Sequence, residues 1–548
     1  PRNEMEASLL AIWQEVLGQE QISVKANFFE AGGHSLKAVQ MISAINAKFG
    51  VDVQHKDAFI YTTITELAAH IANKEKLHKD KLVPIEEQDY YNVSHAQKRL
   101  WILNSLEEKQ VAYNIPTASL IEEKINLAYL NESLQKLYER HESLRTVFVM
   151  VGNEPKQKIK PQVDFKVRYL DWSTVSHGID QAVILAHEEA VTPFDLAAGP
   201  LLRVTLIHLA DTRSVLFFTV HHIVVDAVSM QNMMAELMYY YNTSLGKSAR
   251  GDFRPLSIQY KDFSAWQNQQ LAKENLKMHQ NFWVDQFKEG VNTLNFPADF
   301  ERPEVFNNKG RFVHFELEKN LAAGIRNISK ENQTTLFMTS LALVCMLINK
   351  YTKEDDITVG TPVAGREDHK LVDQIGFFVN MLPLRNKIDI GKTFRALLQQ
   401  IRGNVLEAFD HQVYPYDKLV NDLKIPRDRS RNPLFDVVVT ADTFAEERSD
   451  AKTFGSHKLM PLTEDRSLEV CKYDLRFRFS EVGDSMYLNI LYNQSLFKHE
   501  RMLIMKERLK TLIAEVVDNP DKTLTEYKME AKIEQMNIDE EIFADFDF

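Results

Sequence analysis

The sequence predicts a small all-α unit followed by a larger α/β unit that is built in two halves. Three observations lead to this fold class. Residues 1–73 carry apolar side chains at helical spacing. Residues 90–518 alternate apolar, β-branched runs with helical stripes in two successive halves, which is typical of α/β layers. Residues 73–89 between them are charged, lack periodicity and end near a Val-Pro pair, so they are predicted to be a solvated linker.

The composition limits the classes of protein to which this chain can belong. The chain has 548 residues, of which 44% are hydrophobic and 26% charged, as in globular proteins with a sizeable core. Its net charge of −12, without a basic block, argues against a nucleic-acid partner. Cys345 and Cys471 show no CxxC spacing, which argues against a disulfide framework or a zinc knuckle and favours a cytoplasmic location.

The ends of the chain and its most apolar stretch predict no membrane contact. The N-terminus lacks the charged and apolar regions of a signal peptide. Residues 336–348 are apolar, but they are too few for a bilayer span of about 20 residues and read as a buried helix. Because the chain does not begin with methionine, we expect it to be part of a larger protein.

Three helices are predicted in the first unit. Apolar residues at helical spacing indicate a helix over 4–17, and Gly18 is suited to its C-cap. A second stripe runs from Ser35 to Phe49 and ends at a glycine. A third helix over 63–72 begins with the capping-box pattern Thr-Ile-Thr-Glu.

Ser35 has two interpretations. Serine is a favoured N-cap residue, so a structural role needs no further reason. Alternatively, the N–H groups without partners and the dipole at a helix N-terminus favour a phosphodiester on this hydroxyl. The glycine pair before it, Gly32-Gly33, frees the backbone just ahead of the helix.

Strands and helices alternate through both halves of the larger unit. The first half, about 90–260, and the second, about 270–518, each contain both kinds of element. The predicted strands are 201–207, 215–220 and 356–360, and the predicted helices are 126–140, 228–241, the buried stretch near 340 and a closing helix over 499–517.

The strand over 215–220 ends at His221-His222, with Asp226 four residues further on. Imidazole suits proton transfer because its ordinary pKa is about 6.5. Adjacent residues on an extended chain point to opposite faces, so one histidine alone can face a given cavity. The same divergence, and the lack of a further ligand at suitable spacing, argue against a metal site.

Residues 28–36, Phe-Phe-x-x-Gly-Gly-His-Ser-Leu, resemble the core motif of peptidyl carrier proteins from nonribosomal peptide synthetases. The resemblance implies a four-helix bundle with 4′-phosphopantetheine attached covalently to Ser35 by a phosphopantetheinyl transferase. His34, where other members have aspartate, is typical of carriers that precede condensation rather than epimerisation domains.

From Tyr90 onward the chain resembles a condensation domain of the same synthetases, and its composition suits a Bacillus-type peptide-antibiotic synthetase. The resemblance implies two lobes similar to each other and to chloramphenicol acetyltransferase, forming a V with a tunnel between them. Seven motifs carry it in the family's order: Ser94–Trp101, Arg140–Phe148, His221–Asp226, Tyr260–Trp266, Ile375–Asn380, His411–Tyr416 and Arg427–Leu434.

The resemblance also implies the domain boundaries and partners. We expect a carrier domain over 1–76, a linker over 77–89, a condensation domain over 90–520 and a linker over 521–548 toward an adenylation domain. The lobes would meet near residues 262 and 263. The expected partners are a downstream aminoacyl carrier domain and the adjacent adenylation domains, with neither nucleic acid nor a membrane.

The reaction implied is amide formation by aminolysis of a carrier-bound thioester. His222 occupies the family's catalytic position, as a general base or as a group that positions the amine and stabilises the intermediate. We expect His221 to be structural, and Asp226 to form a structural ion pair with Arg145 rather than a triad. The side chains of Ser94, Asn380 and Tyr414 are expected to line or brace the tunnel.

Three positions depart from the family pattern: Ala227 replaces a glycine, Met381 a threonine and Val413 an aspartate. The methyl group of Ala227 would interfere if that position needs a positive φ or a close approach by substrate. Two alternatives stay open: an epimerisation domain, which shares the His-His-x-x-x-Asp signature, and a catalytically impaired platform for carrier docking, to which Ala227 points.

Overall fold

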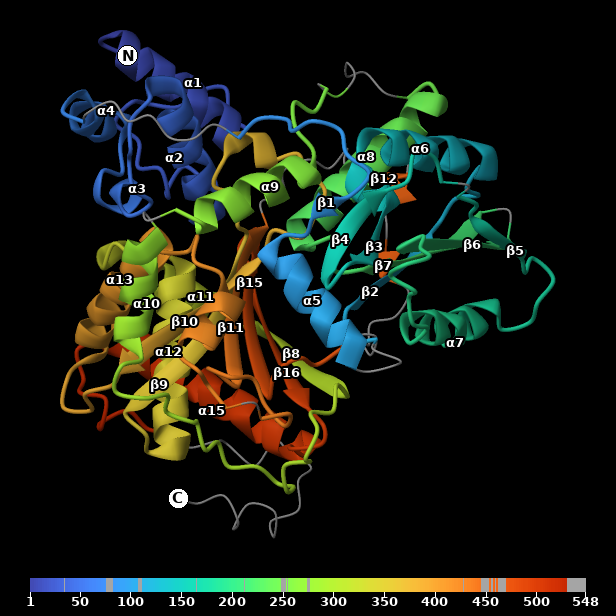
Figure 1. The fold of residues 1–548 in the computed structure, drawn as a ribbon. Coiled ribbons are helices and arrows are strands. Elements are labelled where there is room, and N and C mark those ends of the chain that lie inside the picture. Colours follow the sequence, from blue (N-terminus) through green and yellow to red (C-terminus); the bar gives the residue numbers. More distant parts are fainter. Residues whose placement is uncertain are drawn as a thin grey trace.

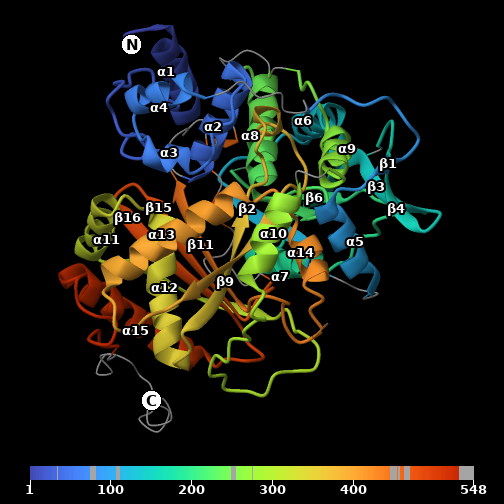
Figure 2. The same cartoon turned by 60° about the vertical axis from the view of Figure 1, so that its left-hand side comes forward.

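The structure is a computed structural model in which a helical domain lies against a two-lobed α/β unit (Figures 1 and 2). We call the two parts of that unit the N lobe (residues 82–273) and the C lobe (residues 276–529). The structure describes residues 1–33, 35–74, 82–106, 111–163, 165–210, 212–247, 253, 255–273, 276–426, 428–444, 453–454, 457–458, 460–461 and 470–529.

The helical domain contains α1 (Glu4–Leu17), α2 (Ser35–Phe49), α3 (Asp57–Ile60) and α4 (Ile64–Ala72). Each predicted helix is present, and α3 adds a turn that is too short to leave a periodic pattern. Gly18 ends α1 at φ 73°, and the predicted capping box between Thr63 and Glu66 forms at the start of α4. The four-helix bundle implied by the resemblance is therefore confirmed.

The N lobe is built on a sheet with strand order β14-β2-β7-β6-β5. Every residue of the central strand β7 after Arg213 is buried, because helices cover one face and the rest of the lobe covers the other. The elements of the lobe are β1 (Tyr91–Asn92), α5 (His95–Leu106), β2 (Asn114–Ile121), α6 (Leu127–Arg140), η1 (Glu142–Arg145), β3 (Thr146–Val151), β4 (Glu154–Ile159), β5 (Arg168–Asp171), α7 (Gly178–Ala190), β6 (Leu202–Ala210), β7 (Arg213–His221), α8 (Ala227–Ser244) and α9 (Tyr260–Leu271).

The C lobe is built on a sheet with strand order β10-β9-β11-β15-β16-β8. Its elements are α10 (Leu276–Gln286), β8 (Gly310–Leu317), α11 (Lys319–Glu331), α12 (Leu336–Thr352), β9 (Asp356–Val363), η2 (His369–Leu371), β10 (Asn380–Lys387), α13 (Phe394–Asp410), α14 (Tyr416–Asp422), β11 (Val437–Phe444), β12 (Thr453–Phe454), β13 (His457–Lys458), β14 (Met460–Pro461), β15 (Leu475–Val482), β16 (Ser485–Asn493) and α15 (His499–Asp518).

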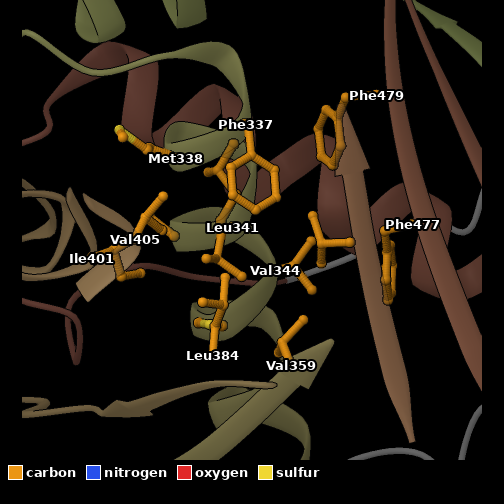
Figure 3. Close-up of a cluster of buried hydrophobic side chains, with 14 of the residues drawn as sticks. Phe337, Met338, Leu341, Val344, Val359, Leu384, Ile401, Val405, Phe477 and Phe479 are labelled. Carbon is orange, nitrogen blue, oxygen red and sulfur yellow. The ribbon is translucent and has the colours of Figure 1, made fainter. Parts of the chain in front are cut away.

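The predicted buried helix is α12, the centre of the C-lobe core. Its side chains Phe337, Leu341 and Val344 lie between α13 and the sheet strands, and Phe477 of β15 packs from the sheet side (Figure 3). No single helix in the described part of the chain is long and apolar enough to cross a membrane, and α11 with α12 meets that test only as a pair bent by 108°.

The two lobes repeat one strand–turn–helix unit. In the N lobe β7 ends at His221 and α8 begins at Ala227; in the C lobe β16 ends at Asn493 and α15 begins at His499. The expected similarity of the lobes is visible in this repeat. The C-lobe copy has Asn493-Gln494 where the N lobe has the histidine pair, so the imidazoles belong to one lobe.

The C lobe also adds a strand to the N-lobe sheet. In β14, Met460 pairs with Leu120 and Pro461 with Ser119 of β2. A proline is tolerated here because β14 lies at the edge of the sheet. This crossover joins the lobes along the side of the cavity described below.

The C-terminal chain continues to pack past residue 520. Leu524 and Tyr527 are buried, and the Leu524 N–H donates to the Lys392 carbonyl at 2.9 Å. This packing lies within the first residues of the predicted linker. The rest of that linker, residues 530–548, and residues 77–81 of the predicted interdomain linker lie outside the described residues.

Candidate functional site

A cavity of about 2280 Å³ lies where the helical domain and the two lobes meet. Gly32 and Gly33 of the helical domain, His222 and Ala227 of the N lobe and Lys472 of the C lobe all line it. One space thus connects the loop before Ser35 with the histidine that the sequence singled out.

The second histidine presents one ring nitrogen to this cavity. The Nδ1 of His222 lies 2.8 Å from the Val225 carbonyl oxygen, and a carbonyl can only accept a hydrogen bond. Nδ1 therefore carries the proton, and the lone pair is on Nε2. The Phe377 ring packs edge-on against the imidazole with centroids 4.8 Å apart, and the backbone N–H of His222 donates to the Tyr113 carbonyl at 2.8 Å, so the ring and the backbone of His222 each have a fixed contact.

The environment keeps His222 neutral at physiological pH. Burial lowers its pKa to about 3, and the positive charge of Lys472 acts in the same direction. A neutral imidazole with its lone pair on Nε2 can accept a proton from a group in the cavity.

His221 points away from the cavity into the N-lobe core. Its Nδ1 accepts a hydrogen bond from the Ile223 N–H at 3.2 Å, and the Phe194 ring packs edge-on against it. Burial lowers its pKa to about 3, because a charged imidazolium would be poorly solvated there. The two imidazoles therefore diverge, and the one that faces the cavity is His222.

The expected ion pair between Asp226 and Arg145 is wrong. Asp226 pairs with Arg366 of the C lobe, whose Nη2 lies 3.1 Å from Oδ1, and both side chains are fully buried. Arg145 instead donates to the Lys160 carbonyl at 2.7 Å and lies 3.6 Å from Glu142. The physical reason is position: Arg145 ends η1 beside β4, away from the start of α8.

Asp226 joins the two lobes through both of its oxygens. Oδ1 accepts from the Ser229 N–H at 2.7 Å, as an N-cap of α8, and Oδ2 accepts from the Phe378 N–H of the C lobe at 3.0 Å. Arg366 completes the cluster by donating to Ser229 Oγ at 2.6 Å and to the Gln374 carbonyl at 2.9 Å. Since both Asp226 oxygens and both terminal nitrogens of Arg366 have partners, the cluster fixes the turn that carries His222.

Arg366 could not be found from sequence motifs because it lies 140 residues from Asp226. Its local sequence, Val-Ala-Gly-Arg, follows strand β9 and carries no recognised signature. The conformation of this loop does depend on a glycine, Gly365. It has φ 64°, and a Cβ there would lie 2.1 Å from the Phe378 carbonyl oxygen.

The three residues expected to line or brace the tunnel all form bracing contacts, and none is among the described residues that line the cavity. Ser94 Oγ lies 2.8 Å from the Tyr260 hydroxyl. Asn380 Nδ2 donates to the carbonyls of Gln412 and Tyr414 at 2.9 and 2.7 Å. The Tyr414 hydroxyl donates to Asp422.

Ala227 is the first residue of α8, and its φ is negative, because it is absent from the positive-φ residues of the described chain. The backbone reason for a glycine therefore does not hold at this position. The residue does line the cavity, so its methyl group occupies space beside His222.

The loop before Ser35 suits an attached phosphodiester. Gly32 adopts φ 90°, and a Cβ on Gly33 would lie 2.4 Å from the Phe28 ring, so the chain turns tightly against Phe28. Ser35 then begins the 15-residue helix α2, where free N–H groups favour an anion. His34 lies outside the described residues.

The helical domain contacts the C lobe through charged residues at the edge of the cavity. Lys56 Nζ lies 3.2 Å from Asp410 at the end of α13, and Glu30 lies 2.9 Å from Lys330 of α11. Across the described ranges, no three His, Cys, Asp or Glu side chains converge as metal ligands.

Two family models match the chain. The condensation-domain model matches residues 87–538, and the phosphopantetheine attachment-site model matches residues 7–71. The chain is 36% identical over 529 residues to tyrocidine synthase 2 of Brevibacillus parabrevis, covering 96% of this chain and 14% of that protein. It is 35% identical over 540 residues to bacitracin synthase 2 of Bacillus licheniformis, covering 98% and 20%. The chain thus spans a fifth or less of these relatives.

Solved structures confirm the two-lobed fold. The X-domain from teicoplanin biosynthesis matches with a TM-score of 0.73 and 21% identity, covering 82% of this chain and all of that one. A four-domain nonribosomal peptide synthetase bound to AMP and glycine matches with a TM-score of 0.72 and 22% identity, covering 83% of this chain and 35% of that one. The match to the condensation model does not favour the epimerisation alternative.

Proposed function

Because the chain belongs to the condensation-domain family of nonribosomal peptide synthetases and carries a phosphopantetheine attachment domain before it, we propose that it forms amide bonds between carrier-bound substrates. The donor is an acyl thioester held at Ser35, and the acceptor is the amine of an aminoacyl group on a downstream carrier domain. The observation that carries this proposal is the cavity shared by His222 and the glycines beside Ser35.

Ser35 and the Gly32-Gly33 turn are the residues that would hold the prosthetic group. When bound, phosphopantetheine supplies a flexible arm whose thiol carries the acyl group as a thioester. The N-terminus of α2 would hold the phosphodiester end, and Gly32 and Gly33 leave the loop before Ser35 without side chains where it lines the cavity.

His222 handles the proton of the reaction. It accepts at Nε2 the proton that the amine loses on attacking the acyl carbon, and it returns that proton to the sulfur as the carbon–sulfur bond breaks. The Val225 carbonyl stabilises the transient imidazolium, because it already accepts a hydrogen bond from Nδ1. Holding both substrates in one cavity contributes a further large factor, since it makes their encounter nearly intramolecular.

The proposed function also implies partners, a location and domain boundaries for this chain. The phosphopantetheinyl transferase and the adjacent adenylation domains act on this chain as partners. We place the reaction in the cytoplasm, which suits the two buried free cysteines, Cys345 and Cys471. We keep the domain boundaries predicted from the sequence, except that the buried residues Leu524 and Tyr527 extend the C lobe to residue 529.

The first prediction tests Ser35. Treatment of the chain with a phosphopantetheinyl transferase and coenzyme A should add one phosphopantetheine mass, and Ser35→Ala should add none, because no other hydroxyl lies in the attachment motif. Intact-mass spectrometry measures this. The matched control is Ser43→Ala on the same helix, which should load as wild type. Loading of Ser35→Ala would remove the donor assignment.

The second prediction tests the interface between the helical domain and the C lobe. Lys56→Glu and Asp410→Lys should each slow amide formation from the attached carrier about two- to fivefold, because a partly exposed ion pair contributes about 0.2–1 kcal/mol. The double charge reversal should restore the rate. Lys25→Glu, elsewhere on the helical domain, is the control. Single reversals without any effect would show that the carrier delivers its substrate from another position.

A further inference from the structure

Lys472 is a cavity residue that the sequence did not single out. It lies just before β15 in the C lobe and lines the same cavity as His222. Its Nζ lies 5.0 Å from the centroid of the Tyr113 ring, and the Tyr113 carbonyl accepts the His222 N–H at 2.8 Å. Tyr113 therefore contacts the Lys472 ammonium through its ring and the backbone of His222 through its carbonyl.

Two positive charges act on this ammonium. Arg99 of α5 and Arg476 of β15 both act on Lys472 as cations, and the aromatic ring of Tyr113 faces it from the segment before β2. Within the part of the chain that the structure describes, no carboxylate lies within 4.0 Å of its Nζ. Enclosing a cation costs free energy unless an anion or a dipole compensates. The cavity at this point is thus suited to a negative charge brought by the substrate.

We propose that the Lys472 ammonium stabilises the negative charge that develops on the donor acyl oxygen when the amine attacks. This inference rests on the proposed function and assigns the second polar role that the reaction requires. As the nitrogen–carbon bond forms, the carbonyl π pair moves to oxygen; as the carbon–sulfur bond breaks, that pair re-forms the carbonyl. His222 carries the proton, and Lys472 remains protonated throughout.

His222 and Lys472 have different roles, proton transfer and oxyanion stabilisation, because their side chains differ in charge. His222 is neutral with a free lone pair, so it suits the proton and offers no positive charge to an oxyanion. Lys472 has three donors and a positive charge that acts in a partly enclosed space, where such charge is more effective than in water. A group of this kind contributes to the transition state more than to substrate binding.

The titration of Lys472 should make the rate of amide formation depend on pH. Burial lowers the pKa of Lys472 to about 7, and the charges of Arg476 and Arg99 add to the effect. The ammonium is therefore present below pH 7 and is lost as the pH rises through 7. Arginine at this position would keep its charge to far higher pH.

The kinetic test compares Lys472→Met with Lys472→Arg in the loaded full chain with an aminoacyl carrier. Lys472→Met should lower kcat about 10²–10³-fold with KM within twofold, as removal of an oxyanion donor does. Lys472→Arg should recover part of kcat. The ratio of its rate to the wild-type rate should rise about tenfold per pH unit above pH 7, because the wild type loses the ammonium and the arginine variant does not. Titration of the acceptor amine affects both rates equally and cancels in this ratio. The control is Lys418→Met, whose Nζ lies 5.9 Å from the Tyr414 ring outside the cavity lining.

A second readout does not depend on the loaded enzyme. Competitive acetylation of the lysines with acetic anhydride at a series of pH values, followed by peptide mass spectrometry, measures the titration midpoint of each lysine. Lys472 should have a midpoint near 7, about three pH units below the ordinary value for a lysine side chain.

The outcomes separate the inference from the proposed function. Wild-type kcat in Lys472→Met, an acetylation midpoint near 10, or a pH-independent ratio for Lys472→Arg would each overturn the role of Lys472 while amide formation by the wild type stands. If the loaded wild type forms no amide, the proposed function fails and the inference fails with it.

Discussion

Replacing His222 with alanine is expected to lower the rate of amide formation by about 10²–10⁴-fold, the range for loss of a positioned proton-transfer group. The physical reason is the single free lone pair on Nε2, which the hydrogen bond from Nδ1 to Val225 fixes. The fold should be unaffected, because the side chain faces the cavity. The measurement is single-turnover transfer from the loaded chain to an aminoacyl carrier, with the thermal midpoint as the check on folding.

The control for this result is His187→Ala, another histidine that lines the cavity, on α7. It should keep the wild-type rate within about threefold. The protonation state can be tested directly: in ¹⁵N-histidine spectra, the resonance missing from His222→Ala should not titrate between pH 5 and 8, because burial lowers the pKa of His222 to about 3. An unchanged rate in His222→Ala would refute the catalytic assignment.

Replacing Asp226 with alanine is expected to destabilise the protein by about 3–5 kcal/mol, the cost of leaving one member of a buried ion pair without its partner. Arg366 would remain fully enclosed with its charge uncompensated, and the N–H groups of Ser229 and Phe378 would lose their acceptor. Arg366→Met should have a comparable effect. Both variants should also slow amide formation, since the turn that carries His222 depends on this cluster. Urea denaturation measures the loss.

Arg145→Met is the matched control, because Arg145 was the partner that the sequence predicted. Its pair with Glu142 is partly exposed, so this variant should cost about 1 kcal/mol or less. The double variant Asp226→Leu, Arg366→Met should be less destabilised than the sum of its single variants, because it removes both charges at once. A larger loss for Arg145→Met than for Arg366→Met would contradict the pairing seen here.

The sequence alone was sufficient for features whose cause is local. The helix over 4–17 with its glycine cap, the buried strand before the histidine pair and the apolar helix near 340 are each fixed by spacing along the chain, and all are present. The attachment motif around Ser35 and the His-His-x-x-x-Asp motif are also contiguous. Motifs of this kind were enough to predict the carrier and condensation domains and the two-lobed fold.

The partners of those motifs depended on contacts between distant segments. Arg366 reaches Asp226 because the loop after β9 packs under the turn after β7, and no spacing along the chain encodes that meeting. Lys472 lies at the wall that includes His222 because the segment before β15 in one lobe faces Tyr113 of the other. The local sequence therefore determined which side chains are able to react. The packing of the lobes determined which charges surround those side chains, because electrostatic interactions depend on distance in space and not on separation along the chain.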